Sequence, residues 1–446
     1  MGHRSLPHLV RSFARLYGPK PVLTALPPSG LAEYTWLDLH DAAWGVAKGL
    51  VAAGFPADGT AIVLSADSPE ALFAEVAVQV AGGAALAVAP PIGVEELAAE
   101  IAATGCSAVL ASEPLTGLAA AAAGVSGRPV AEWQLDPIAP GRPEPGAGDD
   151  TPELEARLDR LGPEVAAAIV RAGAPGAGGR HAVLPHRALL GTGAAVARAL
   201  AAGEADAWLL AGPATHPFVR AAGWWAPLAS CGHAVLGGPD PLEAAWAARP
   251  RVATCLAADL PAFVERLLAE VGATRGLQAT FARWAVEGAA EGEKGGIGAR
   301  IRRALAAAAG PELVRQVVGG AMECMVAGWG PADGTAVRVL AALGVEVRTA
   351  WGPPEACGVA TLGRPSEPPG GRPLDGTVVS VDEKGEIGIA GPGIMFSWLG
   401  TSPEVNPALE GGVLRTGEAG RIGADGSLIV TGRMGDAGPG AGVGAG

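Results

Sequence analysis

A glycine-dense segment, Val165–Arg187, is the part of this sequence most suggestive of a ligand site. It is predicted to form a buried β-strand, a glycine-rich loop that ends at Arg180, and a new helix. Glycine lets a backbone turn sharply and approach a ligand closely, so several N–H groups of such a loop can point at one phosphate. The loop lacks the Gly-Lys-Ser/Thr of a Walker motif. In a chain so rich in glycine, a plain flexible connector is the alternative interpretation.

Composition narrows the functions that this chain can have. Its 446 residues include 45 acidic and 32 basic side chains, which gives a formal net charge of −13. This balance disfavours nonspecific binding to nucleic acid or to an anionic membrane surface. Any anionic ligand must therefore be held by local geometry. Only four residues can supply an ammonium group, and these are Lys20, Lys48, Lys294 and Lys384.

The cysteines and the apolar runs bear on where in the cell the protein is expected to reside. The five cysteines are widely spaced, odd in number and without a Cys-x-x-Cys pair, a pattern that fits a reducing compartment and disfavours disulfides or a zinc site. Two charge-free runs, Val76–Val94 and Ala221–Pro239, are long enough to span a membrane, but glycine and proline interrupt both. The N-terminus lacks the features of a secretory signal. We therefore expect a cytoplasmic protein with no transmembrane segment.

The elements that must position the loop alternate along the first two thirds of the chain. Apolar residues at three-and-four spacing predict helices at Thr35–Ala53, Pro69–Val80, Val94–Ala103, about His186–Ala202 and about Pro261–Ala269. Short β-rich runs predict strands at Thr60–Ser65, Ala84–Val88, Ser107–Leu110, Val165–Val170 and Ala207–Leu210. Short buried strands that alternate with helices are typical of parallel βαβ units.

The remaining segments follow other patterns. Glu132–Pro152 is rich in proline, glycine and acid and predicts a surface linker, whereas Phe281–Arg315 predicts a long helical segment. After Trp351, short strands beside Gly, Pro or Asp are predicted at Thr377–Val381, Gly385–Ala390 and Ser427–Val430. We therefore predict an α/β protein with a first α/β lobe (1–160), a second α/β lobe with the glycine-rich loop and a helical insert (161–345), a β-rich lobe (346–436) and a disordered tail (437–446).

The order of residues around the loop resembles the phosphate loop of adenylate-forming enzymes. In that family a hydroxyl-Gly-hydroxyl sequence precedes Gly-x-Pro-Lys-Gly and a helix that starts with Thr-His-Arg. Here Ala172–Ala177 takes the place of the hydroxyl residues and glycines, and Arg180 takes the place of the lysine. His186 and Arg187 match the His-Arg pair.

Further blocks extend the resemblance over nearly all the chain and point to the long-chain fatty acyl-CoA synthetases. Gly328–Pro331 is similar to the family's glycine-rich turn beside adenine, and Ala350–Glu355 to its Gly-Tyr-Gly-x-Thr-Glu motif. The blocks GEIGIAGPGIMFSWLG and LRTGEAGRIGADGSLIVTGRMGD resemble the closing strands up to the hinge, where Asp436 falls. The resemblance implies the large N-terminal domain of these enzymes: two βαβ lobes with parallel-type sheets plus a β-rich lobe, with an acyl tunnel and a nucleotide cleft at their junction.

The resemblance also implies a chemistry. ATP and a fatty acid would give an acyl-adenylate, and CoA would then displace AMP. Carried over by position, Trp351 would stack on adenine, Glu355 would hold Mg²⁺ against the phosphates, and Glu418 would accept the ribose hydroxyls in place of an aspartate. Arg433 could pair with the nucleotide. The glycines placed along the nucleotide are Gly173, Gly176, Gly178, Gly328 and Gly352.

Two further positions complete the implied catalytic set. Arg180 stands for the loop lysine, and His216 matches the histidine that borders the acyl site. Each site residue has a structural alternative when it is taken singly: Trp351 as a core residue, Glu355 as a solvated loop acid, His216 as a satisfied buried histidine, and Arg433 as half of a surface ion pair. Their joint occurrence in the family's order favours the functional interpretation.

The departures from the family pattern predict impaired adenylation. Pro354 replaces a threonine whose hydroxyl touches the α-phosphate, and the loop hydroxyls are gone. Each lost charge-assisted hydrogen bond is worth about 1.5–3 kcal/mol. The family's catalytic lysine lies in a small C-terminal domain beyond the hinge. Because this sequence ends ten residues after Asp436, we expect that domain to be absent.

Three functions therefore stay open. The first is a residual fatty-acid–CoA ligase, or one completed by a separate lysine-bearing domain. The second is a noncatalytic module that binds an acyl group or an acyl carrier protein. The third is an acyltransferase that uses a premade acyl thioester without ATP, although no Gly-x-Ser-x-Gly motif supports it.

Overall fold

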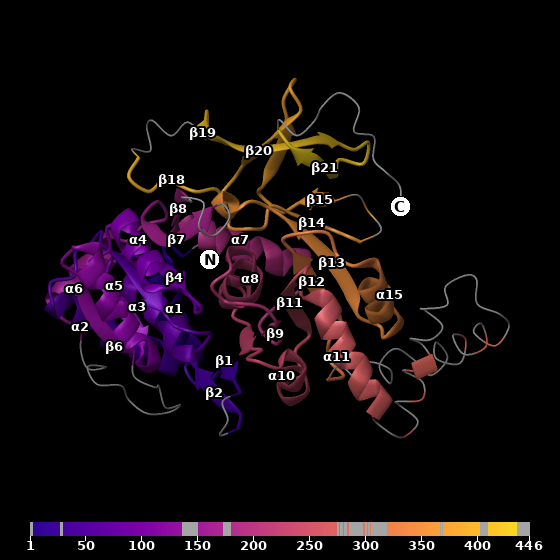
Figure 1. Cartoon of the computed structure of the whole chain (residues 1–446), viewed down its shortest axis with the longest axis horizontal. Helices are drawn as coiled ribbons and strands as arrows, with labels where there is room; N and C mark the ends of the chain where they lie inside the picture. The colour runs from indigo at the N-terminus through magenta and orange to yellow at the C-terminus, as the bar shows by residue number, and fades with distance from the viewer. Residues whose placement is uncertain are drawn as a thin grey trace.

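Two β-sheets with helices packed around them lie side by side, and a β-rich part sits above both (Figure 1). The structure is a computed structural model that describes residues 3–26, 30–135, 150–172, 180–273, 276, 280, 283–284, 298, 301, 304, 319–365, 367, 369–401 and 409–434.

The first sheet is mostly parallel and has the strand order β18-β8-β7-β4-β3-β5-β6 within the described residues. Strands β3 to β7 pair in parallel, whereas β8 pairs antiparallel with β7 and with β18. The strands are β3 (Thr60–Leu64), β4 (Ala84–Val88), β5 (Ala108–Ser112), β6 (Ala131–Leu135), β7 (Ala166–Ala172), β8 (Arg180–Pro185) and β18 (Ser397–Trp398).

Several of the helices around this sheet begin at residues with strong capping chemistry. The Ser68 hydroxyl accepts the N–H of Ala71 ahead of α3, and Thr35 and Asp38 form a capping box at the start of α2. Helix α2 ends before Gly54, whose φ of +83° suits glycine. The helices are α1 (Leu6–Tyr17), α2 (Trp36–Ala52), α3 (Pro69–Val80), α4 (Val94–Thr104), η1 (Glu113–Leu115), α5 (Thr116–Ser126) and α6 (Pro152–Arg160).

The second sheet continues into the β-rich part. Its parallel portion has the order β13-β12-β11-β9-β10-β1, and β2 closes the edge antiparallel to β1. The strands are β1 (Pro21–Ala25), β2 (Ala32–Thr35), β9 (Ala207–Leu210), β10 (His233–Leu236), β11 (Val252–Leu256), β12 (Cys324–Gly328) and β13 (Glu346–Trp351). The helices are α7 (His186–Ala199), α8 (Pro217–Arg220), the π-helical turn η2 (Ala221–Trp225), α9 (Ala226–Ala229), α10 (Pro241–Ala248), α11 (Leu260–Ala273) and α15 (Gly334–Ala342).

The β-rich part is built from antiparallel pairs, beginning with β14 against β13. Its elements are η5 (Pro354–Ala356), β14 (Thr361–Gly363), β15 (Gly370–Pro373), β16 (Val378–Val381), β17 (Glu386–Ala390), β19 (Leu409–Glu410), β20 (Val413–Ile422) and β21 (Leu428–Arg433).

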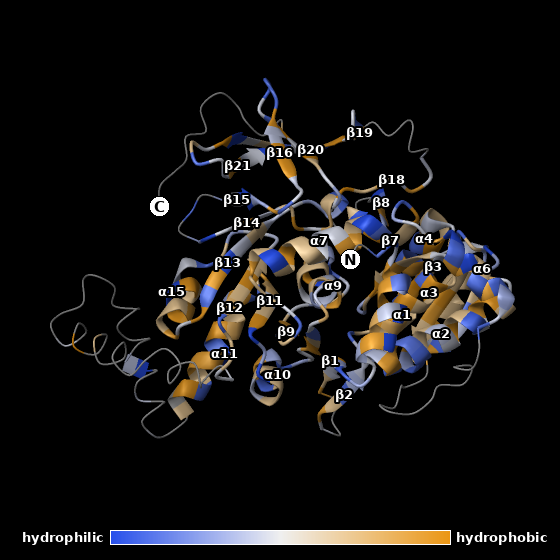
Figure 2. Ribbon diagram, turned by 180° about the vertical axis from the view of Figure 1, so that it is seen from behind, coloured by the Kyte–Doolittle hydropathy of each residue, from blue (hydrophilic) through white to orange (hydrophobic). Residues whose placement is uncertain are grey.

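Burial follows the sheets. Hydrophobic residues concentrate on the central strands and on the helices that cover them (Figure 2). The largest fully buried side chains include Trp36, Trp44, Trp208 and Trp224. Among the helices of the described residues, none has both the length and the apolar character needed to cross a bilayer.

The structure confirms the α/β class with parallel-containing sheets and corrects two local predictions. The glycine-rich loop leads into a strand, β8, before the helix begins at His186. The loop therefore joins two antiparallel strands and does not open a helix directly. The predicted linker Glu132–Pro152 was also wrong at its start, because residues 131–135 form β6, an edge strand in which Trp133 and Leu135 are less exposed than the polar residues between them.

Several predictions lie outside the described residues or stay predictions. The tail 437–446, Asp436 and most of Phe281–Arg315 are outside the described residues. The division into segments 1–160, 161–345 and 346–436 stays a prediction. The chain crosses between the sheets more than once, because β1 and β2 join the second sheet and β7 and β8 join the first.

Candidate functional site

Several of the predicted site residues lie at or just after the carboxyl ends of strands from both sheets. The glycine-rich loop follows β7, Gly328 ends β12 and Trp351 ends β13. The pairing of Gly328 with Ala350 places the turn after β12 beside Trp351. The short helix η5 packs against β7 and β8, which joins the two sheets at this point. In open α/β sheets, ligands bind outside the carboxyl ends of the strands.

Trp351 and Glu418 form the central pair of this site. The indole Nε1–H of Trp351 donates a hydrogen bond to Oε2 of Glu418 at 2.7 Å, and both side chains are half-buried. On the neighbouring strand β21, Arg433 lies directly opposite Glu418 and is exposed. The residues predicted for adenine, for ribose and for a nucleotide charge therefore adjoin one another.

Glu355 and Arg180 bring opposite charges to the same place. Burial raises the pKa of the Glu355 carboxyl, the Glu418 carboxylate raises it further, and Arg180 opposes both effects. Arg180 is exposed at the first residue of β8, and its guanidinium lies 5.4 Å from the ring centre of Trp398. The backbone carbonyl of Glu355 accepts the N–H of Met395 at 2.7 Å, which fixes η5 against the segment before β18.

His216 lies on the other side of the turn after β12. Its ring meets that of Trp329 edge-on at 4.8 Å between centres, and its Nδ1 accepts the backbone N–H of Phe218 at 3.2 Å. Burial, assisted by Arg220, lowers the pKa of His216 to about 4, so the ring is neutral at pH 7. Because Nδ1 accepts, the proton is on Nε2. His216 can therefore donate one hydrogen bond from Nε2.

The glycines at Gly328 and Gly352 are required by close packing. A Cβ on Gly328 would lie 2.7 Å from the ring of Phe218, and one on Gly352 would lie 2.6 Å from the backbone nitrogen of Ala360. The first contact brings α8, which follows His216, close to the end of β12. The other predicted glycines, Gly173, Gly176 and Gly178, lie outside the described residues.

The stem of the glycine-rich loop is fixed by charges that sequence reasoning missed. Arg171 and His181 face each other across β7 and β8, and both contact Glu100 of α4, at 3.0 Å and 2.5 Å. Arg171 also reaches Glu96 at 3.3 Å. Burial alone would raise the pKa of Glu100. Its hydrogen bond with His181 and its contact with Arg171 outweigh burial, so the pKa of Glu100 is lowered. The two ends of the loop are thus held to α4.

A second missed pair of charges holds α8, the helix that begins just after His216. Arg220 of α8 donates to Glu75 of α3 at 2.8 Å and to the carbonyl of Ala214 at 3.0 Å, and both charged side chains are almost fully buried. Asp67 accepts the N–H of Ala214 at 3.0 Å. The sequence signal was an arginine and an acid in otherwise apolar runs. These contacts fix α8 against the first sheet.

The His-Arg pair after β8 is structural in this chain. His186 is fully buried, and burial lowers its pKa to about 3. Arg187 pairs with Glu164 at 2.9 Å and donates to the carbonyls of Pro392 and Ile394 at 2.7 and 2.9 Å. Arg187 therefore ties α7 to the segment that leads into β18.

The donor set suits Mg²⁺ bound through phosphates. Mg²⁺ in nucleotide sites usually takes one or two carboxylates and completes its shell with phosphate and water oxygens. Glu355 is a half-buried carboxylate whose ionised form is disfavoured by burial and by Glu418, and a divalent cation would relieve both effects. Within the described residues, no group of three or more His, Cys, Asp or Glu side chains could hold a metal alone.

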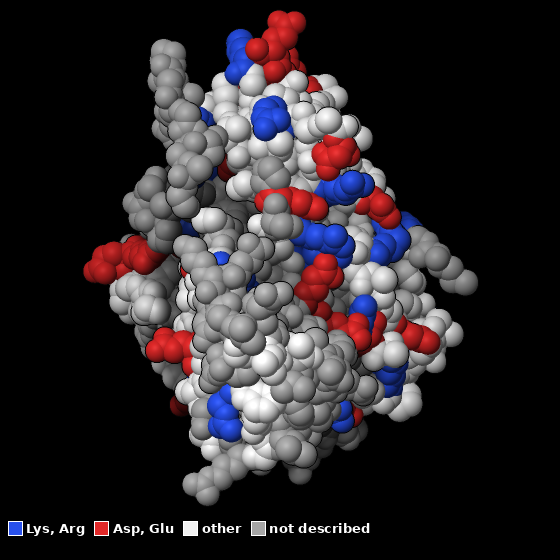
Figure 3. All heavy atoms as spheres, turned by 90° about the vertical axis from the view of Figure 1, so that its right-hand side faces the viewer, with Lys and Arg blue, Asp and Glu red and all other residues white. Residues whose placement is uncertain are grey.

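Surface charge adds little long-range attraction on at least one face. Seen from the right-hand side of Figure 1, the Lys and Arg side chains of the described residues are intermingled with Asp and Glu (Figure 3). On that face an anion would meet no continuous basic area. The local groups of the site must supply its attraction.

Comparison with solved structures identifies the architecture. The structure is similar to a candidate long-chain-fatty-acid CoA ligase from Rhodopseudomonas palustris, with a TM-score of 0.73, 19% identity and coverage of 97% of this chain and 100% of that one. It is also similar to the N-terminal domain of FACL13 from Mycobacterium tuberculosis (TM-score 0.70, 15% identity, 96% and 100% covered) and to unliganded o-succinylbenzoate CoA synthetase, MenE, from Bacillus subtilis (0.68, 15%, 95% and 78%). At these identities the similarity shows the fold alone.

Comparison by sequence identifies the family. No curated protein sequence matches the chain. The family described as AMP-binding enzyme, however, matches residues 10–398, which is most of the chain and extends from α1 to the end of β18. The protein therefore belongs to the AMP-binding enzyme family.

Proposed function

We propose that this protein is a fatty-acyl-CoA ligase that binds ATP between Trp351, Glu355, Glu418 and Arg180. The observation that supports the proposal is the meeting of these four residues, from distant parts of the sequence, near the carboxyl end of β13. The AMP-binding family match and the fold of the neighbouring ligases support the same reaction class.

In this proposal each residue contacts a different part of the nucleotide. The indole face of Trp351 stacks on adenine, and Glu418 accepts the ribose hydroxyls. Glu355 would hold Mg²⁺, which would neutralise phosphate charge, and Arg180 adds a cation at the end of the glycine-rich loop. A fatty-acid carboxylate oxygen attacks the α-phosphorus, and the bond to the bridging β-phosphate oxygen breaks to release pyrophosphate. The CoA thiol then attacks the acyl carbonyl, and AMP leaves.

His216 is assigned to the acyl side of the site. At neutral pH it offers only an Nε2–H donor, because its Nδ1 is occupied by the N–H of Phe218. It therefore orients a carboxylate or carbonyl oxygen and does not act as a base. The buried ion pair of Arg220 with Glu75 holds α8, and with it His216, in place.

The reaction is expected to be slow. Pro354 offers no hydroxyl to the α-phosphate, and removal of a preorganised group of this kind lowers a rate by about 10²–10³. We propose that a lysine-bearing domain, added as a separate polypeptide, raises the rate. Exchange measured with and without such a domain from a fatty-acid ligase tests this part separately.

A second candidate function is an acyl-binding module without nucleotide chemistry. The observation in its favour is the 2.7 Å bond from Trp351 to Glu418, which uses a carboxylate oxygen that ribose would need. The acyltransferase alternative gains no support from the cysteines, because all five are buried and free.

The test is ATP–pyrophosphate exchange with fatty acids of increasing chain length. The ligase proposal predicts exchange that depends on fatty acid and Mg²⁺ and falls at least about tenfold in Glu355→Gln. Glu410→Gln removes an exposed carboxylate of the β-rich part and is the matched control. Fatty-acid binding that is indifferent to ATP, with no exchange even with the added domain, would favour the noncatalytic module.

A further inference from the structure

Glu418 extends from a bulge where the ladder between β20 and β17 is interrupted, while its pairing with Arg433 of β21 is kept. Between β17 and β20, Glu386 pairs with Ala419 and Gly388 pairs with Arg415, so four steps along β20 face only two steps along β17. Residues 416–418 therefore lie opposite Ile387 alone, which is an excess of two residues on β20. Gly417 has a φ of +71°, which glycine adopts readily. A bulge of this kind re-aims the side chains that it carries.

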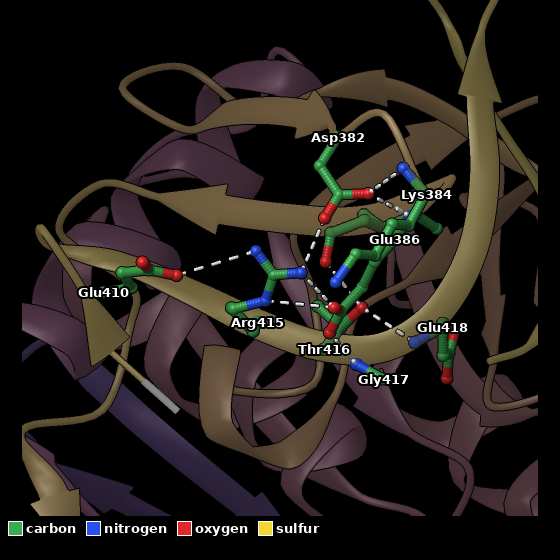
Figure 4. A network of polar contacts seen from close by, with 9 residues as sticks. Asp382, Lys384, Glu386, Glu410, Arg415, Thr416, Gly417 and Glu418 are labelled. Atoms are coloured by element: carbon green, nitrogen blue, oxygen red, sulfur yellow. Dashed lines mark hydrogen bonds and ion pairs between the residues drawn. The ribbon is translucent and has the colours of Figure 1, made fainter. Parts of the chain in front are cut away.

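Side-chain hydrogen bonds take the place of the main-chain bonds that are missing between β17 and β20. Glu386 Oε1 accepts the N–H of Gly417 at 3.1 Å, and the hydroxyl of Thr416 accepts the N–H of Glu418 at 3.1 Å (Figure 4). Thr416 in turn donates to the carbonyl of Ile387 at 2.8 Å. On the side that faces β17, one carboxylate and one hydroxyl therefore hold the backbone from which Glu418 extends, and β21 holds it on the other side.

An ion-pair network holds Glu386 in this position. Its Oε2 accepts Nε of Arg415 at 2.9 Å and is also bonded by Nη2, which reaches Asp382 at 2.6 Å (Figure 4). The Glu386 side chain is only 16% exposed, whereas Glu410, 3.7 Å from the same Arg415, is 79% exposed. Glu386 alone of these two acids also contacts the bulge.

We propose that Glu386 is a positioning residue that aims Glu418 at the ribose and so determines preference for a ribonucleotide over a deoxyribonucleotide. This inference rests on the proposed nucleotide site. Glu386 contacts neither Trp351 nor a nucleotide in this scheme. It acts through Gly417, by fixing the bulge whose next residue bears the carboxylate.

The experiment measures binding of ATP, 2′-deoxy-ATP and pyrophosphate by calorimetry to the full chain. The unmodified chain should bind ATP at least about tenfold more tightly than 2′-deoxy-ATP, because the lost hydroxyl donates to a charged acceptor. In Glu386→Ala this ratio should fall to within about threefold, while pyrophosphate, which has no ribose, should bind with unchanged affinity. Glu410→Ala should keep the full ratio.

A second variant tests the bulge independently, in case Glu386→Ala fails to fold. Thr416→Val keeps the size of the side chain but removes the acceptor for the N–H of Glu418, and it should also lower the ratio. An unchanged ratio in both Glu386→Ala and Thr416→Val would overturn the positioning role and leave the nucleotide site standing. Equal binding of ATP and 2′-deoxy-ATP by the unmodified chain would also overturn it. A lack of ATP binding by the unmodified chain would overturn the proposed function together with this inference.

Discussion

The buried pair of Glu75 and Arg220 makes a specific prediction for the stability of the helix that carries His216. Burial raises the pKa of Glu75 from 4.5 to about 7, Arg220 opposes this rise without cancelling it, and Asp67 adds to it. Because the pKa is higher in the folded state than in the unfolded state, Glu75 favours folding fully below pH 4.5. That contribution is lost as the pH rises through 7.

The magnitude follows from the shift. A change from 4.5 to about 7, at roughly 1.4 kcal/mol per pH unit, corresponds to about 3 kcal/mol. Glu75→Gln removes the titration and keeps an oxygen that can accept from Arg220. Urea denaturation of both proteins at intervals from pH 4.5 to pH 8 gives the free energy of unfolding of each.

The advantage of the unmodified protein over Glu75→Gln should shrink by about 3 kcal/mol across this range. Glu132→Gln, on the exposed edge strand β6, should show no comparable pH-dependent difference. An advantage that stays constant, or that grows with pH, would show that the pKa of Glu75 is not raised by burial. It would mean that Arg220 holds Glu75 ionised in the folded protein.

Three further predictions concern packing, thiols and the site. Gly193→Ala should destabilise the protein by about 1–3 kcal/mol in chemical denaturation, because its Cβ would lie 2.4 Å from the carbonyl oxygen of Trp225. Gly124→Ala, on an open face of α5, should instead stabilise it by about 0.5–1 kcal/mol. All five cysteines should resist a thiol reagent in the folded state and react in urea, since burial raises the pKa of each; rapid labelling of the folded protein would contradict this. Trp351→Phe should lower the free energy of unfolding by about 1–3 kcal/mol through loss of the bond to Glu418, and an unchanged melting curve would count against that bond.

The elements that sequence reasoning predicted best have signals within a few residues. Buried parallel strands such as β3 and β4 are continuous apolar runs. The start of α3 is indicated by a serine cap followed by proline. β8 was missed because its short apolar run lies between a glycine-rich loop and a helix start. Local periodicity gives little information for a strand of this kind.

The contacts that hold the site have no local signal. Glu75 and Arg220 are 145 residues apart, and Glu386 meets Gly417 across 31 residues. A single sequence shows each residue type but not its partner. The resemblance placed Trp351 and Glu418 individually, yet the hydrogen bond between them became visible only in the structure.

Binding of ATP at the site formed by Trp351, Glu355, Glu418 and Arg180 can be measured by calorimetric titration with Mg²⁺-ATP. We expect one site in the unmodified chain, binding about 10- to 100-fold weaker in Glu418→Ala, and unchanged binding in Glu410→Ala. The absence of binding at millimolar ATP, or equal affinity in Glu418→Ala, would contradict this expectation.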